Sequence, residues 1–249
     1  SIFCMDMRKN GERPLITVFD SGIGGLNLLK ECKEKIPQAD FCYFADNFRV
    51  PYGNLPEKLI KKYVFEAFDK MADMRPDIAV VACNTVTSCC VGELRSRYSF
   101  PVAGVQPAVK QAAGRGGKFL VLATKATAES LSFKSLLKGR EGVDEVVKCE
   151  GLAADIEKNI FSLENVDVRS YLPEGRYSSV VLGCTHYVFI SDKIKTFFGC
   201  PVFDGIAGTA DHVREILGIF DHRENGRQKI EFIGGDFCKN EAVFKHICR

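Results

Sequence analysis

The chain contains 249 residues, enough for one large domain or two ordinary ones, and 46% of them are apolar. Its 34 basic and 32 acidic residues give a net charge of +2 without a basic block, which argues against nucleic-acid binding. The longest strongly apolar stretches, such as residues 78–83, are far shorter than the roughly 20 residues of a membrane span. Residues 1–13 lack the apolar core of a signal peptide, so we expect a cytoplasmic protein without a membrane partner.

Eleven cysteines are present, and no two of them have the C-x-x-C spacing. The odd number argues against a disulfide framework, and the missing paired spacing argues against a zinc ribbon. Most of these thiols are therefore expected to be small buried side chains in a reducing compartment. A functional role has to be assigned to particular cysteines from their surroundings.

Short apolar runs alternate with helical patterns along the chain. The runs predict strands at residues 15–19, 41–44, 78–82, 101–104, 119–122, 146–149, 179–182, 201–203 and 230–233. Apolar residues three and four positions apart predict helices at residues 26–36, 56–74, 127–137 and 209–217. This alternation favours an α/β fold with mostly parallel sheets, in which functional sites lie at the carboxyl ends of the strands.

The chain also has the pattern of a diverged repeat of one α/β unit. Cys83 and Cys184 follow similar apolar strands and lie 101 positions apart. Asp20 precedes Cys83 by 63 residues, and Thr124 precedes Cys184 by 60. The near-constant offset favours two similar lobes related by a pseudo-twofold axis, with the active site in the cleft between them. We expect a first lobe of residues 14–105 and 207–249 and a second lobe of residues 106–206.

A glycine-rich loop, residues 20–25 (DSGIGG), follows the first predicted strand and opens a helix. Glycines let a backbone approach a ligand closely, and a helix N-terminus offers unpaired N–H groups to an anion. The loop fails the dinucleotide fingerprint, because Asn27 stands where a third glycine or an alanine is expected. A small carboxylate suits the loop as well as a phosphate does, and a plain strand–helix turn is the alternative.

The two cysteine loops place small polar residues beside a thiol at the end of a strand. A cysteine that begins a helix is expected to have a lowered thiol pKa. The Asn84 amide and the hydroxyls of Thr85 and Thr185 are suited to bind carboxylate oxygens. If the lobes face each other, Cys83 and Cys184 approach one cleft from opposite sides.

Two facing thiols suit the inversion of a stereocentre. One thiolate removes the α-proton from one face of the carbon, and the other thiol returns a proton to the opposite face. Fixed donors in a water-poor cleft must stabilise the carbanionic charge. Asp20 is the expected proton partner of Cys83. His186 is the expected partner of Cys184, with Glu157 supporting the imidazole.

Other functions share some of these features. A related carbon-acid enzyme that acts on aspartate would use the same chemistry. A non-catalytic ligand-binding protein of periplasmic type would have the same two lobes and cleft. A metallohydrolase would use as metal ligands Asp20, Cys83, Cys184 and His186.

Five motifs, in order along the chain, resemble those of the glutamate racemase family within the cofactor-independent aspartate/glutamate racemase superfamily. They are residues 19–26 (FDSGIGGL), 49–53 (RVPYG), 82–85 (ACNT), 124–127 (TKAT) and 182–186 (LGCTH). The resemblance runs from about Ile16 to Asp236, nearly the whole chain. The cysteine pair alone would also fit aspartate racemases.

The resemblance implies interconversion of L- and D-glutamate without pyridoxal phosphate or a metal, by a homodimer that supplies D-glutamate for peptidoglycan. It implies that Cys83 deprotonates the D-enantiomer and Cys184 the L-enantiomer. It assigns auxiliary acid–base roles to Asp20, His186 and Glu157. The substrate-binding residues that it implies are Ser21, Pro51, Tyr52, Gly53, Asn84, Thr85, Thr124, Thr127 and Thr185.

The chain departs from this family pattern at several positions. Asn47 and Phe48 stand where the family usually has a small hydroxyl residue and an alanine. Tyr187 and Val188 replace the usual proline and leucine after the histidine. These departures leave every expected proton carrier in place.

Overall fold

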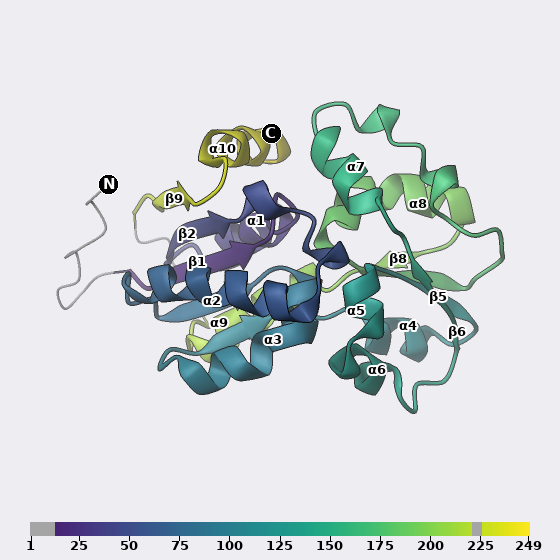
Figure 1. Cartoon of the computed structure of the whole chain (residues 1–249), viewed down its shortest axis with the longest axis horizontal. Helices are drawn as coiled ribbons and strands as arrows, with labels where there is room; N and C mark the ends of the chain where they lie inside the picture. Colours follow the sequence, from purple (N-terminus) through teal and green to yellow (C-terminus); the bar gives the residue numbers. More distant parts are fainter. Residues whose placement is uncertain (1–12, 221–225) are drawn as a thin grey trace.

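The computed structural model describes residues 13–220 and 226–249 of the chain shown in Figure 1. Residues 1–12, which belong to the segment expected to lack a signal peptide, lie outside the described residues. Two β-sheets lie side by side, each with helices on both faces (Figure 1). Every strand pairing in the described ranges is parallel. The α/β class with mostly parallel sheets is therefore confirmed.

The first sheet has five strands and uses both ends of the chain. They are β1 (Leu15–Asp20), β2 (Asp40–Ala45), β3 (Ile78–Val81), β4 (Val102–Gly104) and β9 (Ile230–Ile233). Their order across the sheet is β4-β3-β1-β2-β9. One face packs on helices α1 (Leu26–Lys35), α9 (Ile206–Ile216) and α10 (Phe237–Ile247). The other face packs on α2 (Glu57–Ala72) and α3 (Asn84–Arg97).

The second sheet has four strands from the middle of the chain. They are β5 (Phe119–Ala123), β6 (Val143–Lys148), β7 (Ser179–Gly183) and β8 (Val202–Phe203), in the order β6-β5-β7-β8. One face packs on α7 (Leu152–Lys158), a 3₁₀ segment (Thr185–Ile190) and α8 (Ser191–Phe198). The other face packs on α4 (Val109–Arg115) and α6 (Leu131–Leu137), with the short α5 (Lys125–Glu129) preceding α6.

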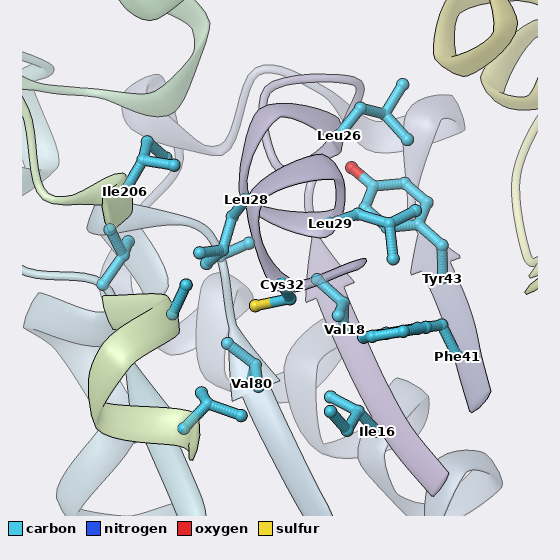
Figure 2. Packing of buried hydrophobic residues seen from close by; sticks show 14 of the residues in the cluster. Ile16, Val18, Leu26, Leu28, Leu29, Cys32, Phe41, Tyr43, Val80 and Ile206 are labelled. Atoms are coloured by element: carbon cyan, nitrogen blue, oxygen red, sulfur yellow. The ribbon is translucent and has the colours of Figure 1, made fainter. Parts of the chain in front are cut away.

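The core of the first sheet shows why its strands are almost continuously apolar. Successive side chains of a strand point to opposite faces, and both faces are covered by helices. Figure 2 shows Ile16 and Val18 of β1 beneath α1, whose Leu28, Leu29 and Cys32 belong to the same buried cluster. The opposite face of β1 carries buried Phe19 and packs against α2 and α3. This packing fixes the ends of the strands and therefore the loops that follow them.

The two sheets place corresponding parts of the repeat in corresponding positions. In the first sheet Phe19 of β1 pairs with Val81 of β3, and in the second Ala123 of β5 pairs with Gly183 of β7. Asp20 ends β1 and Thr124 directly follows β5. Cys83 lies two residues after β3 and Cys184 lies one residue after β7, and each directly precedes a helical segment. This is the two-lobed arrangement that the repeat predicted.

The predicted strands agree with the structure to within one residue at each end, except residues 146–149. That strand is β6, which begins at Val143 at the edge of the sheet. The single helix predicted at residues 127–137 is wrong. The chain forms two helices there, because Ser130 adopts an extended backbone and its hydroxyl accepts the Phe133 N–H at 3.1 Å, capping a new helix.

Four further short 3₁₀ segments occur in the described part of the chain. They are Asn47–Arg49, Tyr52–Asn54, Leu163–Asn165 and Val168–Ser170. None of the helices in the described ranges combines the length and the apolar character needed to cross a bilayer. All ten cysteines in the described part of the chain are free thiols.

Candidate active site

Cys83 and Cys184 occupy equivalent positions at the boundary between the two sheets. Each has an extended backbone, and each stands directly before a helical segment, α3 in one lobe and the 3₁₀ segment in the other. Each exposes only 7% of its surface. The Ser21 hydroxyl lies 3.6 Å from the Cys83 sulfur, and the neighbouring Asp20 accepts the hydroxyl of Thr185, the residue after Cys184, at 3.2 Å. The two thiols therefore belong to one site.

The Cys83 thiol is largely shielded from solvent in this closed conformation. Burial, and after it the nearby Asp20 carboxyl, raise its pKa to about 12. The Val86 N–H at the start of α3 and the Ser21 hydroxyl, 3.6 Å from the sulfur, act in the opposite direction. The expectation of a lowered thiol pKa at this helix start is wrong for Cys83, because desolvation outweighs the helix donor.

Asp20 links the two lobes beside this thiol. Its side chain is fully buried, and burial raises its pKa despite the neighbouring His186. One carboxyl oxygen accepts the Gly22 N–H at 2.7 Å, and the other accepts the Thr185 hydroxyl at 3.2 Å. Asp20 acts on Cys83 through its charge, while its hydrogen bonds go to these two donors. A carboxyl with a raised pKa is suited to hold and release a proton here.

His186 and Glu157 form a relay that leads to Cys184. His186 Nδ1 lies 4.0 Å from the Cys184 sulfur, and its Nε2 lies 2.7 Å from Glu157 Oε2. Burial opposes charge on the imidazole, but the contacts with Cys184 and Glu157 outweigh it and raise the His186 pKa well above its ordinary value. Burial likewise opposes the Glu157 carboxylate, yet the His186 hydrogen bond and neighbouring donors lower its pKa to about 2.

Glu157 is bound by donors from both lobes. Its Oε2 also accepts the Ile23 N–H at 3.0 Å, and its Oε1 accepts from Asn47 at 3.2 Å and from Lys239 at 3.1 Å. The sequence interpretation missed both side chains. Asn47 was visible only as a departure from the family pattern, and Lys239 lies in a C-terminal helix without a recognisable motif. No periodicity or spacing connects residue 239 to residue 157.

The glycine-rich loop brings the two lobes into close contact. A Cβ built at Gly22 would lie 2.6 Å from Glu157 Oε2, and one built at Gly24 would lie 2.6 Å from Thr185 Oγ1 and 2.8 Å from the His186 backbone nitrogen. In this structure two N–H groups of the loop bind carboxylates of the protein itself, Gly22 to Asp20 and Ile23 to Glu157. Glycine is required here because the opposing lobe occupies the space of a side chain.

Hydroxyl groups from both lobes meet at the starts of α3 and α5. Thr85 Oγ1 lies 2.9 Å from Thr124 Oγ1 and 3.3 Å from Thr127 Oγ1, and the last two are 2.9 Å apart. Asn84 is 4% exposed, and its amide nitrogen has no protein partner. Buried donors are normally satisfied, so an unpartnered amide beside a thiol is suited to a ligand.

The segment at residues 51–53 covers this hydroxyl group cluster. A Cβ at Gly53 would lie 2.6 Å from the Thr124 Cβ, so the segment rests on the opposite lobe. The Tyr52 hydroxyl donates to Asp46 at 2.5 Å, and the Tyr52 side chain lies in the same buried cluster as Cys83. Pro51 leads into the same 3₁₀ turn. The structure thus gathers all the expected site residues near one boundary, although the Tyr52 hydroxyl is engaged elsewhere.

The metallohydrolase alternative requires several side chains to converge on one point. Within residues 13–220 and 226–249, no group of three or more His, Cys, Asp and Glu side chains is arranged to hold a metal ion.

The Glu157–His186 pair predicts a pH window for stability. The Glu157 pKa falls from an ordinary 4.5 to about 2, so its contribution is present above pH 4.5 and is lost as the pH drops toward 2. The His186 pKa rises from 6.5, so its contribution is complete below pH 6.5 and declines as the pH rises through the higher folded value. Both pKa shifts arise from the same Glu157–His186 interaction, which should stabilise the fold most between pH 4.5 and pH 6.5.

Urea unfolding at a series of pH values tests this window. In the Glu157→Gln variant we expect the loss of stability below pH 4.5 to become shallower than in the wild type. Parallel curves for the two proteins would show that the pair does not titrate as described.

A two-lobed fold with paired thiols at matching strand ends is typical of isomerases that move a proton between the two faces of one carbon. The profile of the Asp/Glu/Hydantoin racemase family matches residues 53–213, and the chain belongs to this family. It is 34% identical over 227 residues to a glutamate racemase from Clostridium acetobutylicum, covering 86% of this chain and 88% of the relative. A glutamate racemase from Halothermothrix orenii is 35% identical over 214 residues, covering 81% and 84%.

Solved structures show the same fold. The glutamate racemase from Thermus thermophilus, in complex with β-chloro-D-alanine, is 28% identical and superposes with a TM-score of 0.71, covering 95% of this chain and 94% of the other. The Escherichia coli glutamate racemase, in complex with L-glutamate and the activator UDP-MurNAc-Ala, is 26% identical with a TM-score of 0.77, covering 94% and 95%. These relatives make the chain an amino-acid racemase, which is an isomerase.

Proposed function

We propose that this protein interconverts L- and D-glutamate by two-base proton transfer, with Cys83 and Cys184 as the bases and without pyridoxal phosphate. The observation that carries the proposal is the placement of the two thiols. They follow the equivalent strands β3 and β7, and the Asp20–Ser21 pair beside Cys83 is hydrogen-bonded through Asp20 to Thr185, the residue after Cys184. The names of the relatives support glutamate as the substrate.

The reaction from L- to D-glutamate is a pair of proton transfers on opposite faces. The Cys184 thiolate removes the α-proton, and the electron pair of the broken C–H bond is held as a carbanion. The Cys83 thiol then donates its proton to the opposite face of the same carbon. The products are D-glutamate, a Cys184 thiol and a Cys83 thiolate. Exchange of protons through His186 and Asp20 restores the starting state.

Substrate binding falls to the polar groups that surround the thiols. The unpartnered Asn84 amide and the Thr85, Thr124 and Thr127 hydroxyls supply donors for the carboxylates of glutamate. Such fixed donors also stabilise the charge that develops on the carbanion. The other proposed binding residues are Ser21, Pro51, Tyr52, Gly53 and Thr185.

Access to this site requires the lobes to separate. Both thiols are 7% exposed, and Gly53 rests directly on Thr124 of the other lobe. Closure over the substrate would exclude water from the carbanion. The proposed lobe boundaries are residues 14–105 with 207–249, and residues 106–206. Sheet membership supports them, because β9 pairs with β2 after the chain has completed the second sheet.

Three further properties belong to the same proposal. The protein acts in the cytoplasm and supplies D-glutamate for peptidoglycan, as expected for a glutamate racemase. It is a homodimer, an arrangement that would cover exposed apolar side chains such as Phe48 and Phe220. An aspartate racemase remains the alternative, since the same thiol chemistry would serve it.

Incubation with each glutamate enantiomer in D₂O tests the function. Circular dichroism should decay to zero from either enantiomer under reducing conditions. Deuterium should enter the α-position mainly in the newly formed enantiomer, because each thiol serves one face. Loss of optical activity with aspartate but not glutamate would move the substrate assignment to aspartate. An unchanged signal with both amino acids, with Cys83 and Cys184 shown to be reduced, would refute the racemase mechanism.

A further inference from the structure

The C-terminal helix α10 belongs to the first lobe but reaches across to the second. Val243 and Phe244 on α10 are buried in the same core cluster as α1. At the start of the helix, Lys239 donates from Nζ to the backbone carbonyl of Glu157 at 3.0 Å and to its Oε1 at 3.1 Å. Figure 1 shows α10 lying over the first sheet on the side of α7, the helix that carries Glu157.

A buried amide pair secures the same contact. Asn240 has no exposed surface, and its side chain exchanges hydrogen bonds with the Asn47 side chain at 2.9 and 3.1 Å. Asn47 also donates to Glu157 Oε1 at 3.2 Å. The loop after β2 and the start of α10 therefore converge on one carboxylate oxygen.

The two oxygens of Glu157 have separate tasks. Oε2 accepts from His186 and from the Ile23 N–H, whereas Oε1 accepts from Lys239 and Asn47. If Glu157 had only the first pair of donors, its carboxylate group could rotate, and Oε1 could replace Oε2 as the atom that contacts His186. Lys239 is the charged member of the second pair and is 29% exposed at its side chain, while Glu157 is 8% exposed. The lysine therefore fixes the carboxylate without touching the thiol.

We propose that Lys239 is a positioning residue for proton exchange at Cys184, acting through Glu157 and His186, with the Asn47–Asn240 pair as its support. This inference rests on the proposed two-thiol function. The side chains beside Cys83 are Asp20 and Ser21, and in the described part of the chain their side-chain hydrogen bonds go to Gly22, Thr185 and Cys83 rather than to Lys239, Glu157 or His186. Loss of the lysine should therefore affect one face of the substrate.

A one-sided reaction is needed to test this. For racemisation the value of kcat/KM is the same in both directions, because the enantiomers have equal free energies. Glutamate with chlorine on the β-carbon is different: removal of the α-proton allows chloride to leave, and the resulting enamine hydrolyses to a keto acid and ammonia. Each configuration at the α-carbon then reports the thiol on its own side, and released chloride measures the rate.

The expected result concerns the ratio of the two elimination rates. Lys239→Met should lower kcat for the L-configured chloroglutamate by about 10-fold or more, because a small displacement of a proton-transfer group is costly, and should leave the D-configured isomer unchanged. Lys239→Arg, which keeps the donor and the charge, should recover most of the rate. In a Glu157→Gln background the Lys239→Met change should have no further effect.

Lys245→Met is the matched control. Lys245 lies on the same helix and forms an ion pair with Glu241, one turn away, at 2.6 Å. It should leave both eliminations unchanged. The L-to-D ratio does not depend on how much of a variant is folded, so reduced stability of Lys239→Met does not obscure the result.

An unchanged ratio in Lys239→Met would overturn the positioning role. A loss that is equal for both configurations would assign the lysine a merely structural role and also overturn the proposal. If wild-type protein racemised glutamate while either result was obtained, the two-thiol function would stand and only this inference would fail. If wild-type protein did not racemise glutamate, the proposed function itself would fail.

Discussion

Replacing Cys83 or Cys184 by serine is expected to abolish racemisation of glutamate, with a loss of about 10²–10⁴-fold or more for each variant. A serine hydroxyl is nearly the same size but does not ionise in the pH range where a thiol does. Each thiol serves one face of the carbon, so neither can replace the other. The decay of circular dichroism from D- and L-glutamate, measured under reducing conditions, provides the rate.

Cys90→Ser is the appropriate control for these variants. Cys90 is also buried, on α3 about two turns beyond Cys83. Its thiol donates to the Val86 carbonyl at 3.3 Å, which a hydroxyl can do as well. We expect it to retain activity. All three variants should unfold cooperatively, with a free energy of unfolding within about 1 kcal/mol of the wild-type value. Substantial activity in either single active-site variant would show that the reaction does not need two thiols.

Gly24→Ala is expected to reduce activity by about 10²-fold, although the substitution adds only one methyl group. The new Cβ would lie 2.7 Å from His186 Nδ1 and 2.8 Å from the His186 backbone nitrogen. A backbone atom cannot move aside as a flexible side chain can, so the lobes must shift relative to each other. Because His186 lies next to Cys184, this shift displaces the proton partner of one thiol. Steady-state kinetics with L-glutamate would measure the loss.

Gly92→Ala separates this effect from a general effect of removing glycine. Gly92 lies in the exposed part of α3, and a Cβ there would meet no atom within 4 Å. Alanine in a helix interior should raise stability by about 0.5–1 kcal/mol and leave activity unchanged. If Gly24→Ala were as active as Gly92→Ala, the lobes would have more freedom at this contact than the described structure shows.

The elements that could be predicted from the sequence are those whose pattern is imposed by burial. The central strands of both sheets are covered on two faces, so their residues form short continuous apolar runs with clear ends. The helix at residues 127–137 could not be divided correctly, because the interruption depends on the Ser130 hydroxyl accepting a backbone N–H rather than on hydrophobic spacing. The amphipathic pattern continues through the break.

The site was predictable where the chain carries its chemistry in local motifs. The loops around Asp20, Cys83 and Cys184 lie at strand ends, and parallel topology gathers them. The contributions of Asn47 and Lys239 were not predictable, since they depend on how a C-terminal helix docks beside α7. The raised pKa of Cys83 was also not predictable, because its main cause is burial of the thiol, which depends on tertiary packing.

The two lobes each carry a thiol at a comparable strand end, but the side chains beside the two thiols differ. Cys83 has a fully buried carboxyl and a serine hydroxyl for neighbours, whereas Cys184 has an imidazole paired with a carboxylate. Mirror-image amino acids have identical energies in free solution, so their overall conversion is thermodynamically neutral. The different neighbours of the two thiols can therefore change kcat and KM for the two enantiomers only by the same factor, so that kcat/KM stays equal. The enantiomer with the lower KM should also have the lower kcat.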